Sequence, residues 1–192
     1  GTATHRLVLP PRTSALREAE GPPETVFERQ FAAWRKSDPR EEIPCLSGFM
    51  VTVQDTALDE HVRSSLMQTV YAKIVGQLRK DRRVLRIEDN QFIWFSPDVH
   101  PDDGLTPVER IRQILANTRF LHEDNALVVA VQAAVVAVSA QDRPSELITC
   151  LQRTLQHALE KGDGPTCVDM GRGPSFMQPP KLDLEETECL IE

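Results

Sequence analysis

The sequence has little that would point to a metal, a disulfide framework or a membrane. Its four cysteines (Cys45, Cys150, Cys167 and Cys189) form no CxxC pair, and its five histidines form no HxxxH or Cys/His cluster. A zinc site of converging ligands is therefore not expected, and isolated cysteines are typical of reduced thiols inside a cell. The longest apolar run, 126–138, contains Gln132 and falls short of the roughly 20 residues that span a bilayer. These absences predict a cytoplasmic chain without a cofactor.

Basic residues are fewer than acidic ones, and the common catalytic motifs are absent. The 22 lysines and arginines against 29 aspartates and glutamates give a formal net charge of -7. Bulk charge of this sign disfavours nucleic acid and anionic membranes as partners. No GxxxxGK[ST], GxGxxG, GxSxG or HExxH string occurs, so none of the nucleotide-binding or hydrolytic sites that these motifs build is predicted.

The 192 residues suit one domain of about 150 residues with tails. Residues 1–23 contain four prolines and few periodic apolar positions, so we expect an extended N-terminal arm. Residues 24–170 form the expected domain. Residues 171–192 combine prolines with an acidic end, a composition that favours a tail or linker. Because the sequence begins with Gly1 and not with a methionine, we expect the chain to be part of a larger protein.

Within the expected domain, helical and strand patterns alternate. Apolar spacing predicts helices over 24–36, 58–80, 106–117 and 145–161, and strands over 46–53, 83–88, 91–95, 127–138 and 166–170. Asp89-Asn90 would form a two-residue hairpin turn, and Thr106 would cap a helix with Pro107 at its first position. The order predicts an α+β fold with a ferredoxin-like βαββαβ core, its helices on one face of a mixed, largely antiparallel sheet.

The first predicted helix carries an aromatic stripe formed by Phe27, Phe31 and Trp34. Residues at this spacing lie on one side of a helix. The stripe could pack on the chain's own sheet, or it could bind a partner helix or a second copy of the chain. We therefore consider a protein partner or self-association through this helix.

Several strings resemble the GGDEF family, the diguanylate cyclases that condense two GTP molecules into cyclic di-GMP. The string RIEDNQFIWF, residues 86–95, occupies the place of the family's RYGGDEF signature hairpin, and Arg86 and Phe92 match it. ETVFERQFAAWRK (24–36), MVTVQD (50–55) and LQRTLQHALEKG (151–162) resemble the flanking first helix, first strand and last helix. The resemblance covers about residues 22–170 and implies a GGDEF-type fold.

The residues that carry the family's chemistry are replaced. Glu88 and Asp89 stand where the family has two glycines, which let GTP phosphates approach the turn. Asn90 and Gln91 stand where it has carboxylates, one of them a ligand of Mg²⁺, and a neutral amide replaces a carboxylate poorly at such a cation. Asp55 is the one candidate remnant of the metal site. The resemblance therefore implies a degenerate domain with no catalytic residue.

The family's inhibitory product site, RxxD, matches Arg79-Lys80-Asp81-Arg82 with Arg82 in place of the aspartate. One interpretation is a modified cyclic di-GMP or nucleotide site that uses Arg79, Arg82 or Arg86, since guanidinium groups suit phosphates and guanine edges. The other is a basic helix end that complements the helix dipole.

Three hypotheses follow. The first is a catalytically inactive GGDEF-like regulatory or interaction domain of a bacterial signalling protein. The second is a receptor that binds cyclic di-GMP or GTP without turnover. The third is a weakly active enzyme that uses Asp55 and Glu88 as a displaced metal pair.

Overall fold

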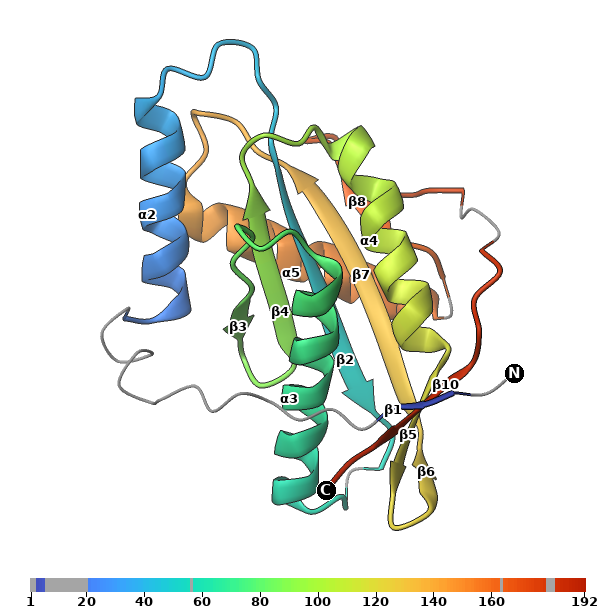
Figure 1. The fold of residues 1–192 in the computed structure, drawn as a ribbon. Helices are drawn as coiled ribbons and strands as arrows, with labels where there is room; N and C mark the ends of the chain where they lie inside the picture. Colours follow the sequence, from blue (N-terminus) through green and yellow to red (C-terminus); the bar gives the residue numbers. More distant parts are fainter. Residues whose placement is uncertain (1–2, 6–20, 56, 163, 179–181) are drawn as a thin grey trace.

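A computed structural model describes residues 3–5, 21–55, 57–162, 164–178 and 182–192. Its centre is a six-stranded sheet in the order β3–β4–β2–β7–β8–β9 (Figure 1). The strands are β2 (Cys45–Val53), β3 (Leu85–Ile87), β4 (Gln91–Ser96), β7 (Val129–Ala137), β8 (Cys167–Asp169) and β9 (Pro174–Phe176). Only β7 and β8 pair in parallel, and the other neighbours are antiparallel. The predicted mixed sheet is confirmed.

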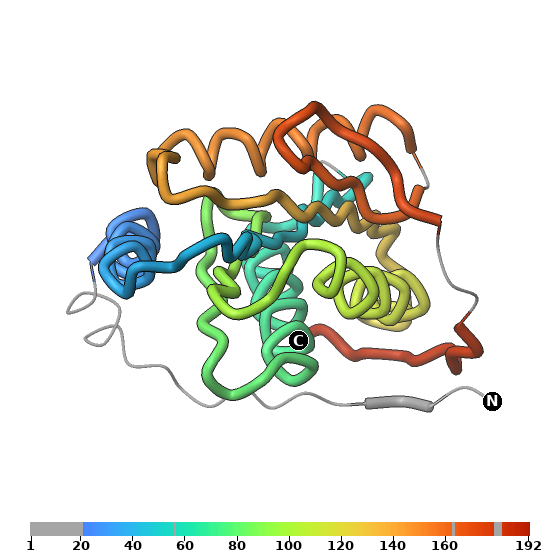
Figure 2. Tube along the Cα trace, turned by 90° about the horizontal axis from the view of Figure 1, so that it is seen from above, coloured from blue at the N-terminus to red at the C-terminus, as the bar shows by residue number. Residues whose placement is uncertain are grey.

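Within the described part of the chain, four helices pack on this sheet: α2 (Pro23–Lys36), α3 (Glu60–Gln77), α4 (Pro101–Ala116) and α5 (Pro144–Lys161). Helices α3 and α4 cover one face and α5 lies across the other (Figure 2). Together with β2, β3, β4 and β7, helices α3 and α4 form the predicted βαββαβ order. Among the described residues, no helix is long and apolar enough to cross a membrane.

The two faces of the sheet belong to two separate apolar clusters because strand side chains alternate in direction. In β4, Phe92 and Trp94 enter the cluster under α3 and α4, whereas Ile93 and Phe95 enter the cluster under α2 and α5. All four side chains are buried. Strands that are covered on both faces are apolar throughout. This explains why an apolar run in the sequence predicts a central strand such as β4.

Helix α4 begins five residues earlier than its predicted start at Thr106. His100 is the N-cap, its Nδ1 accepts the backbone N–H of Asp102, and Pro101 is the first helical residue. Pro107, expected at that position, lies inside the helix. The buried stripe of Pro101, Gly104, Val108, Ile111 and Leu115 runs from the true start. Burial of this stripe therefore outweighs the loss of one helical hydrogen bond at Pro107. Helix α5 likewise begins at Pro144, one residue before its predicted start at residue 145.

A second, four-stranded sheet was not predicted. It has the order β1–β10–β5–β6 and contains β1 (Ala3–His5), β5 (Thr118–His122), β6 (Asn125–Leu127) and β10 (Thr187–Leu190). Strand β10 pairs in parallel with β5, and Cys189 and Ile191 join the apolar cluster beneath α3 and α4. Part of the expected tail, 171–192, thus packs on the domain. Most of the expected arm, 1–23, lies outside the described residues.

The aromatic stripe of α2 packs inside the molecule. Phe27, Phe31 and Trp34 are buried, and the ring centroids of Phe27 and Trp34 lie 5.6 Å and 6.1 Å from that of Phe95 on β4. The sequence left open whether the stripe packs on the chain's own sheet or on a partner. In the structure it packs on the chain's own sheet. A partner that binds α2 would have to use another side of the helix.

Candidate functional site

The signature positions form the turn of the β3–β4 hairpin. Ile87 pairs with Gln91, so the turn contains three residues, Glu88, Asp89 and Asn90, and the predicted two-residue turn is wrong by one position. Glu88 has a φ of 50°, in the left-handed region that residues with a side chain adopt at a cost. A glutamate thus occupies a backbone conformation that favours glycine.

Three polar side chains in and beside the turn, those of Arg86, Asn90 and Gln91, are engaged within the protein. Arg86 donates from Nε (2.9 Å) and Nη2 (2.6 Å) to the carbonyl oxygen of Asp89. Asn90 and Val51 exchange two hydrogen bonds, from Asn90 Nδ2 to the Val51 carbonyl and from the Val51 N–H to the Asn90 carbonyl, each 2.9 Å. Gln91 Oε1 accepts from Gln152 of α5 at 3.0 Å. Asn90 and Gln91 therefore fasten the turn to β2 and α5.

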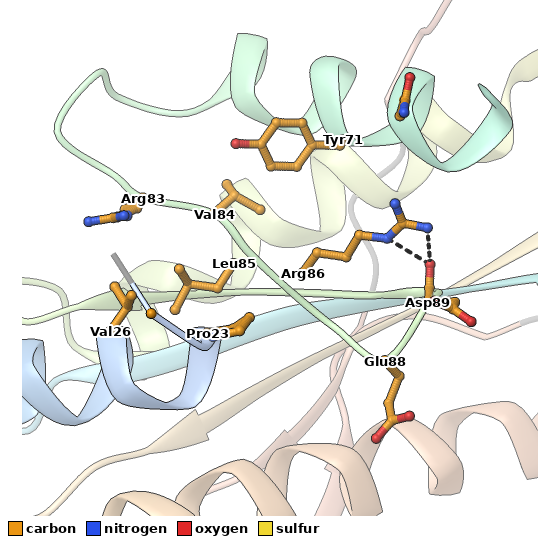
Figure 3. A pocket seen from close by; sticks show the side chains of 11 residues that line it. Pro23, Val26, Tyr71, Arg83, Val84, Leu85, Arg86, Glu88 and Asp89 are labelled. Carbon is orange, nitrogen blue, oxygen red and sulfur yellow. Dashed lines mark hydrogen bonds between the residues drawn. The ribbon is translucent and has the colours of Figure 1, made fainter. Parts of the chain in front are cut away.

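A small pocket of about 270 Å³ lies beside the turn (Figure 3). It is bounded by the start of α2, one side of α3 and strand β3, and its lining includes Val26, Tyr71, Arg83, Val84, Leu85, Arg86, Glu88 and Asp89. Figure 3 shows Arg86 turned toward Asp89, while the Glu88 side chain points away from Arg86. The Arg86 guanidinium already binds the turn's own carbonyl, whereas Arg83 is a second guanidinium in the lining.

A second hollow, of about 500 Å³, lies between the end of β2, the start of α3 and the turn. Its charged lining consists of Glu60, Glu88 and Asp89 against the single cation Arg63. Two unit charges about 4 Å apart repel by about 4 kcal/mol at an effective dielectric constant of about 20. The excess of negative charge in this hollow therefore disfavours the binding of a polyphosphate next to the turn.

Asp55, the candidate remnant of the metal site, lies in a different hollow, lined with His122 and Asn125. Its Oδ1 accepts the backbone N–H of Ala57 at 3.0 Å. Asp55 and Glu88 line two different hollows, which share Leu58 in their walls. Within the described part of the chain, no three His, Cys, Asp or Glu side chains are grouped as a metal site would need.

The structure brings Arg79 and Arg82 together on one carboxylate. Asp98, which follows β4, accepts from Arg79 Nη1 at 3.0 Å and from Arg82 Nη2, and Arg79 also pairs with Asp81 at 2.7 Å. Burial raises the pKa of Asp98, but the hydrogen bonds from Arg82 and Arg79 outweigh it and hold this pKa below its ordinary value. Both arginines are thus partly neutralised by carboxylates.

Arg86 does not belong to this arginine pair. Asp98 lies beyond the end of β4, whereas Asp89 lies before its beginning, so the two arginine contacts are at opposite ends of the hairpin. Sequence reasoning grouped the three arginines as one candidate site and missed Asp98 as the partner of two of them. The acidic residues that follow β4 in the sequence were the available signal. Which arginines Asp98 contacts depends on how the β3–β4 hairpin folds.

Comparison with solved structures identifies the fold as that of GGDEF domains. The GGDEF domain of FimX from Pseudomonas aeruginosa superposes with a TM-score of 0.65 at 12% identity over 77% of this chain and 93% of that one. The active GGEEF domain of a diguanylate cyclase from Vibrio cholerae gives a TM-score of 0.60 at 14% identity over 76% and 92%. The diguanylate cyclase SiaD from Pseudomonas aeruginosa, in complex with its activator SiaC, gives 0.58 at 16% identity over 81% and 64%.

No family model and no curated protein matches the sequence. The resemblance first seen in the signature hairpin is thus confirmed at the level of fold. At these identities the match shows the arrangement of helices and strands alone, because one fold can support many functions.

Proposed function

We propose that this chain is a regulatory or interaction domain of a bacterial signalling protein that has the GGDEF fold and lacks diguanylate cyclase activity. The observation that carries the proposal is the turn of the β3–β4 hairpin. Glu88 and Asp89 bring two carboxylates to the place where the fold's enzymes hold GTP phosphates, and the side chains of Asn90 and Gln91 are hydrogen-bonded to the protein itself. The domain would act in the cytoplasm by binding another protein.

The placement of the remaining acidic groups in different hollows supports the same conclusion. Phosphoryl transfer by two metal ions needs carboxylates that converge on the transferred group. Asp55 and Glu88 line different hollows, and the amide of Asn90 is a weak ligand for a hard cation. A regulatory domain needs none of these groups, because its output is a change in a protein contact.

The proposal is tested by calorimetric titration of the full chain with GTP and Mg²⁺, followed by chromatography of the mixture. We expect no heat of binding and no cyclic di-GMP. Binding accompanied by steady formation of cyclic di-GMP would make the chain an enzyme and overturn the proposal.

The convergence of Arg79 and Arg82 favours one alternative, a receptor that binds cyclic di-GMP without turnover. Two neighbouring guanidinium groups can bind phosphate and guanine edges, but here a ligand has to displace Asp98. If the site is a receptor, Asp98→Asn should tighten cyclic di-GMP binding and Arg82→Ala should abolish it. Titration of the chain and both variants with cyclic di-GMP decides between this alternative and the proposal, which predicts no binding by any of them.

A further inference from the structure

The C-terminal strand β10 is bound to the domain by its backbone along both edges. It lies between β1 and β5 and pairs in parallel with both, so no hairpin turn joins it to either neighbour. The N–H of Thr187 donates to the carbonyl of Asn117 at 3.1 Å, and the N–H of Ile191 donates to the carbonyl of Leu121 at 2.7 Å. Backbone pairing with the edge of a sheet is one of the ways in which proteins bind an extended peptide.

Two alternate side chains anchor the strand. Cys189, which is 0% exposed, and Ile191, which is 4% exposed, enter the apolar cluster beneath α3 and α4. Leu190, between them, is 40% exposed. Figure 2 shows this segment in red beside α3 and α4, on the side of the sheet opposite to α5. Because strand side chains alternate in direction, sites for alternate side chains give strand addition its specificity.

Arg119 of β5 contacts the outward side of the strand. It pairs with Glu188, its register partner, at 2.9 Å and with Glu186 at 3.7 Å. The groove that holds β10 therefore offers a backbone edge, an apolar surface and a cation. An extended segment with acidic residues ahead of alternate apolar residues fits all three, and the chain's own C-terminus has this pattern.

Every copy of the chain has both the groove and the strand that fits it. Residues 177–186 connect β9 to β10, and a connection of this length spans up to about 35 Å when extended. A strand that leaves its own groove can thus reach the groove of a second molecule. Because the contacts are the same in both arrangements, exchange changes the contact energy little and is favoured by concentration.

We propose that this groove is a strand-docking surface through which two copies of the chain associate by exchanging their C-terminal strands. In the exchanged dimer, Thr187–Ile191 of each copy pairs with β5 of the other, and Glu188 of each copy meets Arg119 of the other. The inference rests on the proposed interaction role and specifies the surface and the partner.

A charge exchange between groove and strand tests the proposal with the full chain. Arg119→Glu places a carboxylate in the groove, and Glu186→Lys combined with Glu188→Lys places ammonium groups on the strand. Each variant alone has like charges across this contact, which are destabilising, both within one molecule and in an exchanged dimer of its own kind. In an equimolar mixture, exchange gives every groove a strand of opposite charge. By analytical ultracentrifugation, we expect the mixture to dimerise about tenfold more tightly than either variant alone.

Two controls separate strand exchange from general attraction between oppositely charged proteins. Glu123→Lys combined with Asp124→Lys makes the same change of charge in the exposed β5–β6 turn, and its mixture with Arg119→Glu should show no such gain. A chain that carries the groove and strand substitutions together has opposite charges within one molecule, and it should recover the thermal stability that the separate variants lose. Failure of either control, or a groove-and-strand mixture that sediments as its separate components do, would contradict the proposal. Because no GTP enters this assay, its outcome is independent of the cyclase test.

Discussion

The guanidinium of Arg86 binds the carbonyl oxygen of Asp89 through Nε and Nη2, at 2.9 Å and 2.6 Å. Both residues belong to the same hairpin, so this contact closes the turn that joins β3 and β4. Arg86, which matches the arginine of the signature string, thus has the carbonyl group of Asp89 as its partner within the protein. Its role is to hold the turn in one conformation.

Replacement of Arg86 should therefore destabilise the domain. We expect Arg86→Ala to lower the free energy of unfolding by about 1–2 kcal/mol, because the turn carbonyl loses a charged donor. Arg86→Lys should recover part of this loss, since an ammonium cannot form the two-pronged contact. Urea unfolding of the three proteins measures the effect. Unchanged stability in Arg86→Ala would show that the contact contributes nothing to the hairpin.

The left-handed conformation of Glu88 gives a second prediction. Glu88→Gly should leave stability unchanged or raise it by up to about 1 kcal/mol, because glycine adopts a positive φ without strain. Glu88→Val should lower stability by about 1–2 kcal/mol, since a β-branched side chain tolerates this region least. Thermal unfolding compares the two variants. A more stable valine variant would mean that residue 88 has an ordinary negative φ.

The stripe on α2 gives a prediction about self-association. Phe31 is 1% exposed and packs in the domain's own core, so Phe31→Ala should lower the free energy of unfolding by about 3–5 kcal/mol. Glu28→Ala, at an exposed position of the same helix, is the control and should change it little. Denaturant unfolding and analytical ultracentrifugation test both. A Phe31→Ala variant of normal stability with altered oligomeric state would instead place the stripe in an interface.

Glu109 predicts a pH dependence of stability. This carboxylate is fully buried on α4 and accepts hydrogen bonds from Arg112 and from the N–H and hydroxyl of Thr166, which precedes β8. Burial raises the pKa of Glu109, but the hydrogen bonds from Arg112 and Thr166 outweigh it and hold this pKa below its ordinary value of 4.5. The unfolded carboxyl therefore binds its proton at higher pH than the folded one.

The stabilisation from Glu109 is accordingly complete above about pH 4.5 and is lost as the pH falls through the lower folded-state pKa. At pH 7, Glu109→Gln should cost about 2–4 kcal/mol. The difference in free energy of unfolding between the unmodified chain and Glu109→Gln should shrink progressively as the pH falls below about 4.5. Urea unfolding at a series of pH values measures the difference, and a constant gap down to pH 2 would contradict the assigned shift.

The parts of the fold that sequence predicted are those with strong local patterns. Helix α3 repeats apolar residues every four positions, and β7 is almost entirely apolar. Strands β5 and β10 lack such a signal because they are short and pair across a long stretch of chain, with Thr187 next to Thr118. No local pattern encodes that pairing.

The candidate site divides in the same way. The identities of the residues from Glu88 to Gln91 could be read from the sequence alone. The engagement of Gln91 by Gln152, and of Arg79 and Arg82 by Asp98, could not. These contacts join segments that are distant in the sequence, so no local pattern encodes them.

The most direct test of the absence of cyclase chemistry is incubation of the concentrated chain with GTP and Mg²⁺, with products separated by chromatography. An active diguanylate cyclase domain, treated in parallel, establishes that the conditions support the reaction. The account predicts that this chain leaves GTP unchanged while the active domain consumes it. Cyclic di-GMP formed at a steady rate by this chain, and lost in Asp55→Asn, would contradict it.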